Sequence, residues 1–180
     1  MSKIMIASDI HGSAFWCEKL IDAFKQLQPD VFVLLGDLLY HGPRNPLPDG
    51  YAPQKVAELL SSIKTKLVCV RGNCDSEVDQ MVLDFPMLAD YAMLMIDAQK
   101  IYATHGHLHG DTNPPPLEKG TLLINGHTHL PTKKTLDNGV VYANCGSVAL
   151  PKDGSPHSYV VLEKGVLTWF DLETGNPFNP

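Results

Sequence analysis

The chain has 180 residues, of which 44% are hydrophobic and 19% are charged. This length and composition predict one globular domain over residues 1–180 and exclude disorder, collagen and coiled coil as the main structure. The 14 basic and 20 acidic side chains give a net charge of −6, which disfavours binding to a long nucleic acid. Because the sequence has no apolar run of about 18 residues, we expect no contact with a membrane interior.

The cysteines and the opening residues bear on where the protein works. Cys17, Cys69, Cys74 and Cys145 form no C-x-x-C pair and no dense framework. Thiols of this kind, in a chain that can build its own core, indicate a reducing compartment. The opening apolar stretch is too short for a secretory signal and runs straight into charge. We therefore expect a cytoplasmic protein.

The first part of the chain alternates between buried strands and amphipathic helices. Residues 3–8, 31–35 and 67–70 are short apolar runs that predict strands. Between them, apolar residues recur at helical spacing over residues 16–27 and 56–63. The order strand, helix, strand, helix, strand predicts a parallel sheet with right-handed crossovers.

The second half is predicted to be mostly antiparallel β-structure. Strand patterns follow one another with no room for long helices, at residues 91–96, 100–104, 121–125, 140–143, 159–162 and 166–172. The turn sequences Asn138-Gly139 and Lys164-Gly165 are typical of hairpins. Two irregular stretches, residues 38–52 and 107–120, are long for loops in one domain, and loops of this length are usually functional.

Residue types that bind metals come directly after the predicted strands. The first three strands are followed by carboxylate, imidazole and amide side chains, and the fifth and sixth strands by histidines. In an open α/β sheet the carboxyl ends of the strands line one crevice, where ligands bind. We therefore expect seven donors to converge on one edge of the sheet: Asp9, His11, Asp37, Asn73, His105, His127 and His129.

Taken singly, most of these residues have an ordinary structural explanation. Asp9 can serve as a helix cap, and Asn73 can tolerate a left-handed turn. A lone His11 is more often a loop histidine than a ligand. The pair His127 and His129 is a stronger signal, because alternate residues of an extended segment point to the same side. The joint occurrence of all seven, in order and at strand ends, favours a metal site.

The order of these motifs resembles that of the calcineurin-like metallophosphoesterases. The pattern is Asp-x-His, Gly-Asp, Gly-Asn-x-Asp, a single His and Gly-His-x-His, and it extends from Asp9 to Ser147. Within that superfamily, the sequences Ser-Asp-Ile-His-Gly at 8–12 and Arg-Gly-Asn-Cys-Asp at 71–75 resemble the YfcE-type phosphodiesterases. The resemblance implies an α/β fold, a four-layer α/β/β/α sandwich with mixed sheets, and a phosphoric diester hydrolase.

The resemblance also implies a binuclear metal centre. One ion would be held by Asp9, His11, Asp37 and His129, and the other by Asp37, Asn73, His105 and His127. Asp37 is suited to the shared position because a carboxylate has two oxygens. Oxygen and imidazole donors without a thiolate suit Mn²⁺, Zn²⁺, Fe²⁺, Co²⁺ or Ni²⁺ rather than Ca²⁺, and we expect Mn²⁺. Two ions about 3.5–4 Å apart can generate a hydroxide nucleophile and hold phosphoryl oxygens.

Four residues are expected to act in catalysis: Asp37, Asn73, Cys74 and Asp75. Most of the superfamily has a histidine where this chain has Cys74, and that histidine helps to protonate the leaving oxygen. A thiol with a reference pKa near ~8.5 is a weak hydrogen-bond donor and a poor partner for Asp75. General-acid help is typically worth ~10²–10⁴-fold, so its loss favours aryl diesters, whose leaving groups need little protonation. A covalent role for Cys74 is the minor alternative, because no dedicated base accompanies the thiol.

The residues expected to bind substrate carry weaker signals. Arg44 and Asn45, in the first long loop, are expected to contact the phosphate, and His107 is expected to face the substrate. An equally good interpretation is that Arg44 and Asn45 are solvated loop residues. For His107, packing behind the metal ligands is equally plausible.

Three other functions compete with a metal-dependent phosphodiesterase acting on small phosphodiesters. One is a phosphomonoesterase of the same fold. Another is a metal-binding scaffold like the retromer's metallophosphoesterase-like subunit, which lost ligands or a large exposed apolar patch would favour. The third is a nuclease, which the acidic chain disfavours because it lacks a basic, aromatic-rich extension. The sequence also leaves open a homo-oligomer.

Overall fold

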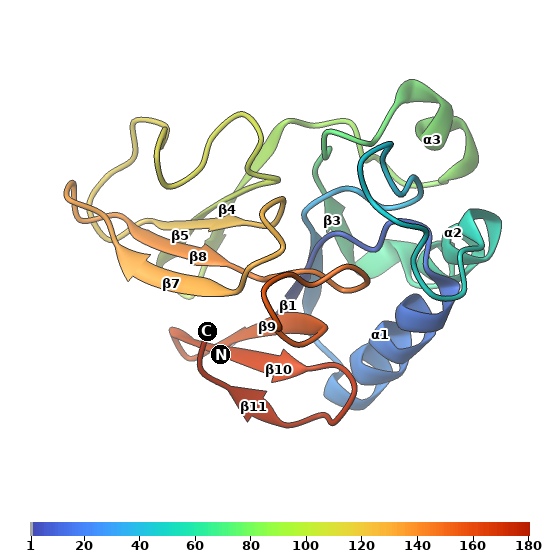
Figure 1. Cartoon of the computed structure of the whole chain (residues 1–180). Helices are drawn as coiled ribbons and strands as arrows, with labels where there is room; N and C mark the ends of the chain where they lie inside the picture. The colour runs from blue at the N-terminus through green and yellow to red at the C-terminus, as the bar shows by residue number, and fades with distance from the viewer. Residues whose placement is uncertain (1) are drawn as a thin grey trace.

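Two mixed β-sheets form the centre of the protein in the computed structural model, which describes residues 2–180 (Figure 1). The first sheet has the strand order β11-β10-β9-β1-β2-β3, and the second has the order β4-β5-β6-β8-β7. The strands are β1 (Lys3–Ala7), β2 (Val31–Leu34), β3 (Leu67–Cys69), β4 (Tyr91–Ile96), β5 (Gln99–Thr104), β6 (Leu122–Asn125), β7 (Thr132–Thr135), β8 (Val141–Asn144), β9 (Ser158–Glu163), β10 (Val166–Asp171) and β11 (Pro177–Phe178).

The helices of the described chain all come before the second sheet in sequence. They are α1 (Ala14–Leu27), α2 (Pro53–Ser61), the short 3₁₀ helix η1 (Lys64–Lys66) and α3 (Glu77–Val82). The Ser13 hydroxyl accepts a hydrogen bond from the Trp16 amide at 3.2 Å and so caps α1. Pro53 begins α2, where its missing amide hydrogen costs nothing. No helix among residues 2–180 is long and apolar enough to cross a membrane.

The alternation of side chains along β1 and β2 divides the core into two layers. Met5 and Phe32 point to one face of the first sheet, where they pack with α1 and α2. Ile4, Ile6 and Val33 point to the other face, where they pack against residues of β5, β6 and β8. Successive residues of a strand face opposite sides, so one continuous apolar run serves both layers. The α/β sandwich with two mixed sheets is therefore confirmed.

The outer face of the second sheet differs from the expected fourth layer of helix. Tyr102, Leu123 and Tyr142 form a small buried cluster on this face, and Leu117 and Leu136 pack against it. Within residues 2–180 the last helix ends at Val82, so no helix covers this cluster. The long loop at 107–120 supplies Leu117 and takes the place of the expected helical layer.

The expectation of a mostly antiparallel second half is wrong for the middle of the second sheet. β5 pairs with β6 in parallel, and β6 pairs with β8 in parallel; only the outer strands β4 and β7 are antiparallel to their neighbours. The loop at 107–120 carries the chain back across the sheet and makes a crossover without a helix. The chain therefore leaves β5 beside the end of β2, and His105 Nδ1 lies 2.7 Å from the Leu35 carbonyl oxygen.

Candidate metal centre

The backbone at the strand ends is strained where candidate ligands stand. Asp9, His11, Asp37, His127 and His129 have φ values of 60°, 49°, 54°, 65° and 64°. A left-handed conformation costs an L-residue roughly 1–2 kcal/mol, although Asp and His tolerate it better than most. Strained backbone at five of the seven candidate ligands is typical of a functional site. The expectation that His127 and His129 lie on an extended segment is wrong for the same reason.

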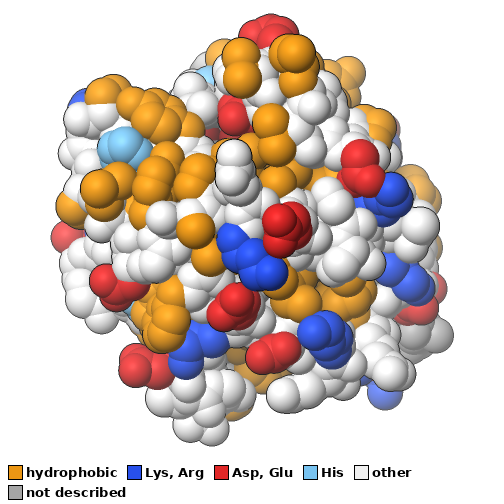
Figure 2. All heavy atoms as spheres, turned by 90° about the vertical axis from the view of Figure 1, so that its right-hand side faces the viewer, with side chains coloured by type: hydrophobic (Ala, Val, Ile, Leu, Met, Phe, Trp, Pro, Cys, Tyr) orange, Lys and Arg blue, Asp and Glu red, His pale blue; other side chains and the backbone are white. Residues whose placement is uncertain are grey.

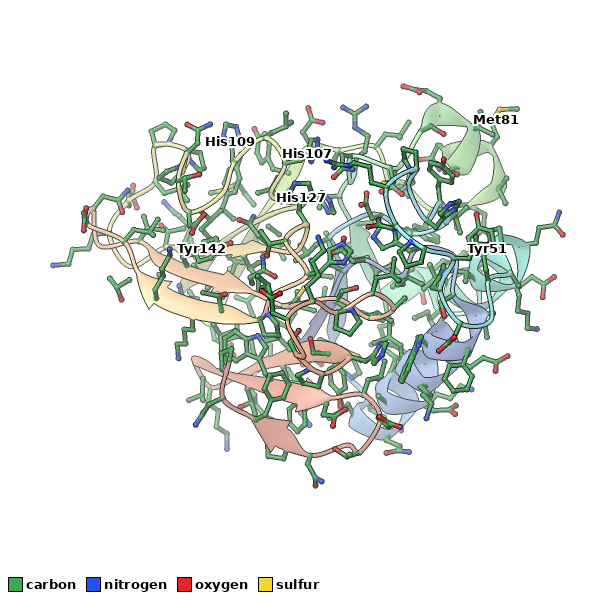
Figure 3. The ribbon with its side chains drawn as sticks, in the orientation of Figure 1. Tyr51, Met81, His107, His109, His127 and Tyr142 are labelled. Carbon is green, nitrogen blue, oxygen red and sulfur yellow. The ribbon has the colours of Figure 1, made fainter. Side chains whose placement is uncertain are left out.

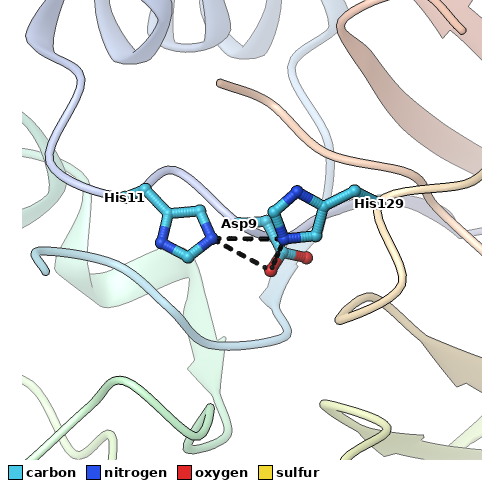
Figure 4. A group of neighbouring side chains, drawn as sticks. All are labelled: Asp9, His11 and His129. Atoms are coloured by element: carbon cyan, nitrogen blue, oxygen red, sulfur yellow. Dashed lines mark hydrogen bonds and ion pairs between the residues drawn. The ribbon is translucent and has the colours of Figure 1, made fainter. Parts of the chain in front are cut away.

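Asp9, His11 and His129 form the first group of donors, called here the Asp9 group (Figure 4). Asp9 Oδ1 lies 3.4 Å from His11 Nε2 and 3.1 Å from His129 Nε2, and the two nitrogens are 3.3 Å apart. All three side chains are buried. Two neighbouring positions and His129, which lies 118 positions after His11, thus present three donor atoms to one point.

Backbone carbonyls orient both imidazoles of the Asp9 group. His11 Nδ1 lies 2.8 Å from the Tyr40 carbonyl oxygen, and His129 Nδ1 lies 2.5 Å from the Leu150 carbonyl oxygen. Because a carbonyl only accepts, each Nδ1 carries the hydrogen and donates it. Each Nε2 of a neutral ring then presents a lone pair to the centre of the group, as in histidines that bind a metal.

The environment of Asp9 tests whether this group suits a metal ion. Its Oδ2 accepts a hydrogen bond from the His127 amide at 2.9 Å, but its Oδ1 is buried without any hydrogen-bond donor. Burial alone would raise the pKa of Asp9, but the adjacent imidazoles of His11 and His129 hold it well below its usual value. A buried carboxylate oxygen without a donor is costly unless a cation lies beside it. The Asp9 group therefore fits a metal ion.

Asp37, Asn73 and His105 form the second group, called here the Asp37 group. His105 Nε2 lies 3.4 Å from Asp37 Oδ2 and 3.1 Å from Asn73 Oδ1. Its Nδ1 faces the Leu35 carbonyl oxygen, so Nε2 points inward and could bind a metal ion once its proton is lost. Burial alone would lower the pKa of His105, but the hydrogen bond to Asp37 and the charges of Asp9 and Asp37 raise it to about 9.

Asp37 stands between the two groups. Its Oδ1 accepts a hydrogen bond from the Cys74 amide at 2.8 Å, which leaves Oδ2 to face the donors. Oδ2 lies 3.7 Å from His11 Nε2 in the first group and 3.4 Å from His105 Nε2 in the second. One carboxylate oxygen, rather than both, therefore faces both groups.

His127 lies beside the Asp37 group from the second sheet. Its ring centre is 5.0 Å from that of His105, and the ring is partly exposed. The glycine before it is required by space, because a Cβ at Gly126 would lie 2.1 Å from Ser8 Oγ. The structure thus brings all seven predicted donors together, but from the ends of strands in two sheets rather than along one edge.

The carboxylate of Asp75 is turned away from the donors and into the backbone. Its Oδ2 accepts hydrogen bonds from the amides of Asp37 at 2.8 Å and Gly72 at 2.7 Å, and its Oδ1 accepts one from Leu38 at 2.9 Å. Both oxygens accept hydrogen bonds from the backbone, so the carboxylate ties two loops together. Asp75 thus positions the loops that carry Asp37 and Asn73, and its part in catalysis stays a prediction.

Cys74 lies at the edge of the site, where its thiol is close to His11 and Asp37. The Asn73 amide donates a hydrogen bond to Cys74 Sγ at 3.3 Å. Partial burial and the negative charge of Asp37 raise the pKa of the Cys74 thiol to about 12. The thiol is therefore protonated at neutral pH and is a poor nucleophile.

A small pocket of about 60 Å³, called here the inner pocket, opens beside the donors. It brings Arg44 and Asn45 next to the candidate ligands, and their contact with phosphate stays a prediction. It also includes Lys152, which the sequence analysis missed because this lysine follows no predicted strand and lies in none of the recognised motifs. The side chains that line the inner pocket include Asp37, Arg44, Asn45, Asn73, Cys74, His127, His129 and Lys152.

His107 is not part of the lining of the inner pocket. Its ring centre lies 5.4 Å from that of His105 and 6.2 Å from that of His127, and Figure 3 shows His107 and His127 on the same side of the molecule. Burial and the nearby charge of His105 lower the pKa of His107. The geometry places His107 beside His105 and His127, and its contact with substrate stays a prediction.

The fold and this site define a class of phosphoesterase. The family model described as the calcineurin-like phosphoesterase superfamily domain matches residues 2–165. The chain belongs to this superfamily.

Named relatives agree with this family. The chain is 48% identical over 168 residues to Phosphodiesterase YfcE of Escherichia coli (strain K12), covering 93% of this chain and 91% of that protein. A solved structure of Yfce, described as a phosphoesterase from E. coli, superposes with a TM-score of 0.95 at 45% identity, over 98% of this chain and 97% of that one. Wild-type Vps29 of Entamoeba histolytica, solved in complex with Zn²⁺, shares the fold, with a TM-score of 0.64 at 18% identity over 98% of this chain and 96% of that one.

Proposed function

We propose that the protein is a metal-dependent phosphodiesterase that hydrolyses small phosphodiesters at the two donor groups. Its assignment as a phosphoric diester hydrolase rests on the family and on the 48% identity to a named phosphodiesterase. The observation that carries the proposal is Asp37 Oδ2, which lies within 3.7 Å of a histidine nitrogen in each group.

The donors support two divalent ions rather than one. Asp9, His11, His129 and Asp37 would hold the first ion, and Asp37, Asn73, His105 and His127 the second. Carboxylate, imidazole and amide donors favour a first-row transition metal, and Mn²⁺ is our proposal for the native ion. Two such ions supply a nucleophile from water at neutral pH and offset the charge on phosphoryl oxygens.

The other side chains of the inner pocket would bind and orient the phosphate. Arg44 and Lys152 place positive charge at the pocket, and Asn45 adds an amide whose Nδ2 donates to the His41 carbonyl at 2.8 Å. A guanidinium and an ammonium are the side chains best suited to phosphoryl oxygens. Arg71 does not share this role, because it pairs with Asp90 at 2.9 Å.

The weak donor at position 74 supports diesters of good leaving groups over monoesters. A protonated thiol offers little help to a departing alkoxide, whereas a phenolate leaves without a proton. A diester also carries a single charge, which suits the small number of cations in the inner pocket. The scaffold alternative loses support, since all seven candidate ligands are present and six of them bring donor atoms close to one another.

The test is a comparison of an aryl phosphodiester with the matching aryl phosphomonoester under the same metal loading. We expect kcat/KM for the diester to exceed that for the monoester, and we expect both activities to vanish on chelation. A monoester turned over faster than the diester would replace this proposal with a phosphomonoesterase.

The four cysteines support a reducing compartment for this activity. Cys17, Cys69, Cys74 and Cys145 are all unpaired thiols. The cytoplasm, where such thiols stay reduced, is our proposal for where the enzyme works.

A further inference from the structure

A second, larger pocket adjoins the inner pocket and has the opposite character. This outer pocket has a volume of about 590 Å³, and Asn73 and Cys74 line both pockets. Its volume falls within the range of about 300–1,000 Å³ that is typical of sites for small organic ligands. Six residues form its apolar wall: Leu39, Tyr40, Tyr51, Pro53, Val78 and Val82.

The apolar wall of the outer pocket is open to solvent. Tyr40 is 40% exposed, Val78 is 66% exposed and Val82 is 52% exposed. Figure 2 shows hydrophobic side chains gathered over the upper part of the face that carries α3. Figure 3 shows Met81 on α3 and Tyr51 on the loop before α2, on the same side of the molecule. Valines exposed to this degree beside an active site suit contact with an apolar ligand.

The two pockets differ in charge and therefore favour different chemical groups. Arg44 and Lys152 line the inner pocket, whereas none of the described residues that line the outer pocket is Lys, Arg or His. The outer pocket has two carboxylates, and both are already hydrogen bonded. Asp75 accepts from three backbone amides, and Asp79 accepts from the amide and hydroxyl of Ser76 at 2.7 and 3.0 Å. A second phosphate is therefore disfavoured in the outer pocket, and an uncharged apolar group is favoured.

The outer pocket is joined to the candidate ligands through Tyr40 as well as Cys74. The Tyr40 carbonyl accepts the hydrogen bond that orients His11, while the Tyr40 side chain lines the outer pocket. A group in the outer pocket is thus close enough to be bonded to a phosphate in the inner pocket. The outer pocket therefore adjoins the candidate metal ligands, unlike an apolar patch elsewhere on the surface.

We propose that the outer pocket binds one apolar substituent, aromatic or short aliphatic, of the substrate phosphodiester. This inference rests on the proposed function and narrows its substrate class to phosphodiesters with an uncharged apolar group, as opposed to nucleoside polyphosphates. The tyrosines and valines supply apolar contact area, and the phosphate is bound by the inner pocket.

Calorimetric binding of phenyl phosphate and methyl phosphate to the manganese-loaded protein tests the proposal. The two ligands carry the same charge and differ only in the substituent, so the ratio of their Kd values isolates the outer pocket. We expect phenyl phosphate to bind about tenfold tighter or more, because burying an aromatic ring removes a large apolar area from water. We expect Val78→Asn and Val82→Asn to lower that ratio about fivefold, and Val166→Asn, at a 59% exposed position on β10, to leave it unchanged.

Three outcomes would overturn the proposal. The first is equal Kd values for the two ligands, and the second is a ratio of Kd values that neither Val78→Asn nor Val82→Asn alters. The third is a concentration-dependent dimer that Val78→Asn dissociates, because a second copy of the chain would then cover the outer pocket. The assay measures binding and needs no turnover. Loss of the proposed function would instead appear as the absence of metal-dependent diester hydrolysis, whatever the ratio of Kd values.

Discussion

At the scale of single residues, Asp37 couples the two donor groups through one oxygen. Oδ1 is held by the Cys74 amide, and Oδ2 faces His11 and His105. Burial would raise the pKa of Asp37, but the hydrogen bond with His105 and the charge of that ring keep it below its usual value. The carboxylate is thus ionised at neutral pH and able to serve two cations.

Asp37→Ala should be the most damaging single substitution in the site, because it removes a ligand from both ions. We expect the variant to retain neither ion and to lose at least about 100-fold in turnover. This loss is larger than that expected from replacing a residue that only hydrogen bonds to a metal ligand. His105→Ala should keep one ion per chain. Metal content by mass spectrometry, measured with turnover on the same samples, distinguishes the two. Equal metal loss in both variants would contradict the shared role of Asp37.

Cys74 is expected to limit the leaving group rather than to attack phosphorus. Cys74→Ser should hydrolyse aryl diesters almost as well as the parent, because a thiol with a pKa of about 12 is not the nucleophile. Cys74→His should recover part of the ~10²–10⁴-fold that a general acid provides, and chiefly for poor leaving groups. Only part is expected, because both oxygens of Asp75 already accept hydrogen bonds from backbone amides and the pocket is not shaped for an imidazole.

A plot of log rate against leaving-group pKa tests both Cys74 variants together. We expect a flatter slope for Cys74→His than for the parent and a parent-like slope for Cys74→Ser. An unchanged slope in Cys74→His, or the loss of all activity in Cys74→Ser, would contradict this account of position 74.

At the scale of elements, the loops after β2 and β3 are packed against each other and held by one carboxylate. A Cβ at Gly72 would lie 2.1 Å from Asp37 Oδ1 and 2.4 Å from the Asp37 amide nitrogen, so no larger residue fits. Asp75 then fixes both loops through amides from each. The position of Asp37 therefore depends on two strand ends at once.

Asp75→Asn should destabilise the protein and misplace Asp37. We expect a loss of about 2–3 kcal/mol in the free energy of unfolding, because buried amides lose a charged acceptor and one faces an NH₂ group. Urea denaturation measures this loss, and Asp153→Asn, at an exposed turn position, is the matched control. An Asp75→Asn variant as stable as the control would show that these hydrogen bonds contribute nothing.

The sequence predicts elements well where local pattern decides them and poorly where distant residues do. Apolar runs placed β1, β2 and β3 almost to the residue, and strand-end motifs brought out all seven donors. β7 was missed because Thr132–Thr135 is a polar edge strand that owes its form to pairing with β8. The parallel pairing of β5 with β6 and the position of Lys152 at the inner pocket are not predicted, because both depend on the path of irregular loops.

At the scale of the whole molecule, the site joins the two sheets. Asp9, Asp37 and Asn73 come from strand ends of the first sheet, and His105 and His129 from strand ends of the second. Ions bound between them would add to the links that already join the two sheets, which are the apolar layer and hydrogen bonds such as that from the His127 amide to Asp9. A ligand that binds only the folded state stabilises it by about 2.7 kcal/mol at 100 times its Kd.

Mn²⁺ should raise Tm, and more so at pH 8 than at pH 6. The pKa of His105 is raised to about 9 in the metal-free fold, so its pairing with Asp37 stabilises fully below about 6.5 and is lost as pH rises through 9. A metal must displace this proton, so its apparent affinity rises with pH while the metal-free protein weakens. Scanning calorimetry with and without Mn²⁺ checks this; a larger rise in Tm at pH 6 would contradict it.

The most direct test of the central claim is a titration of the metal-free protein with Mn²⁺ while hydrolysis of an aryl phosphodiester is followed. The account predicts no turnover without metal and activity that reaches its maximum at two ions per chain. Full turnover in the metal-free protein, or a maximum reached at one ion per chain, would contradict the binuclear centre.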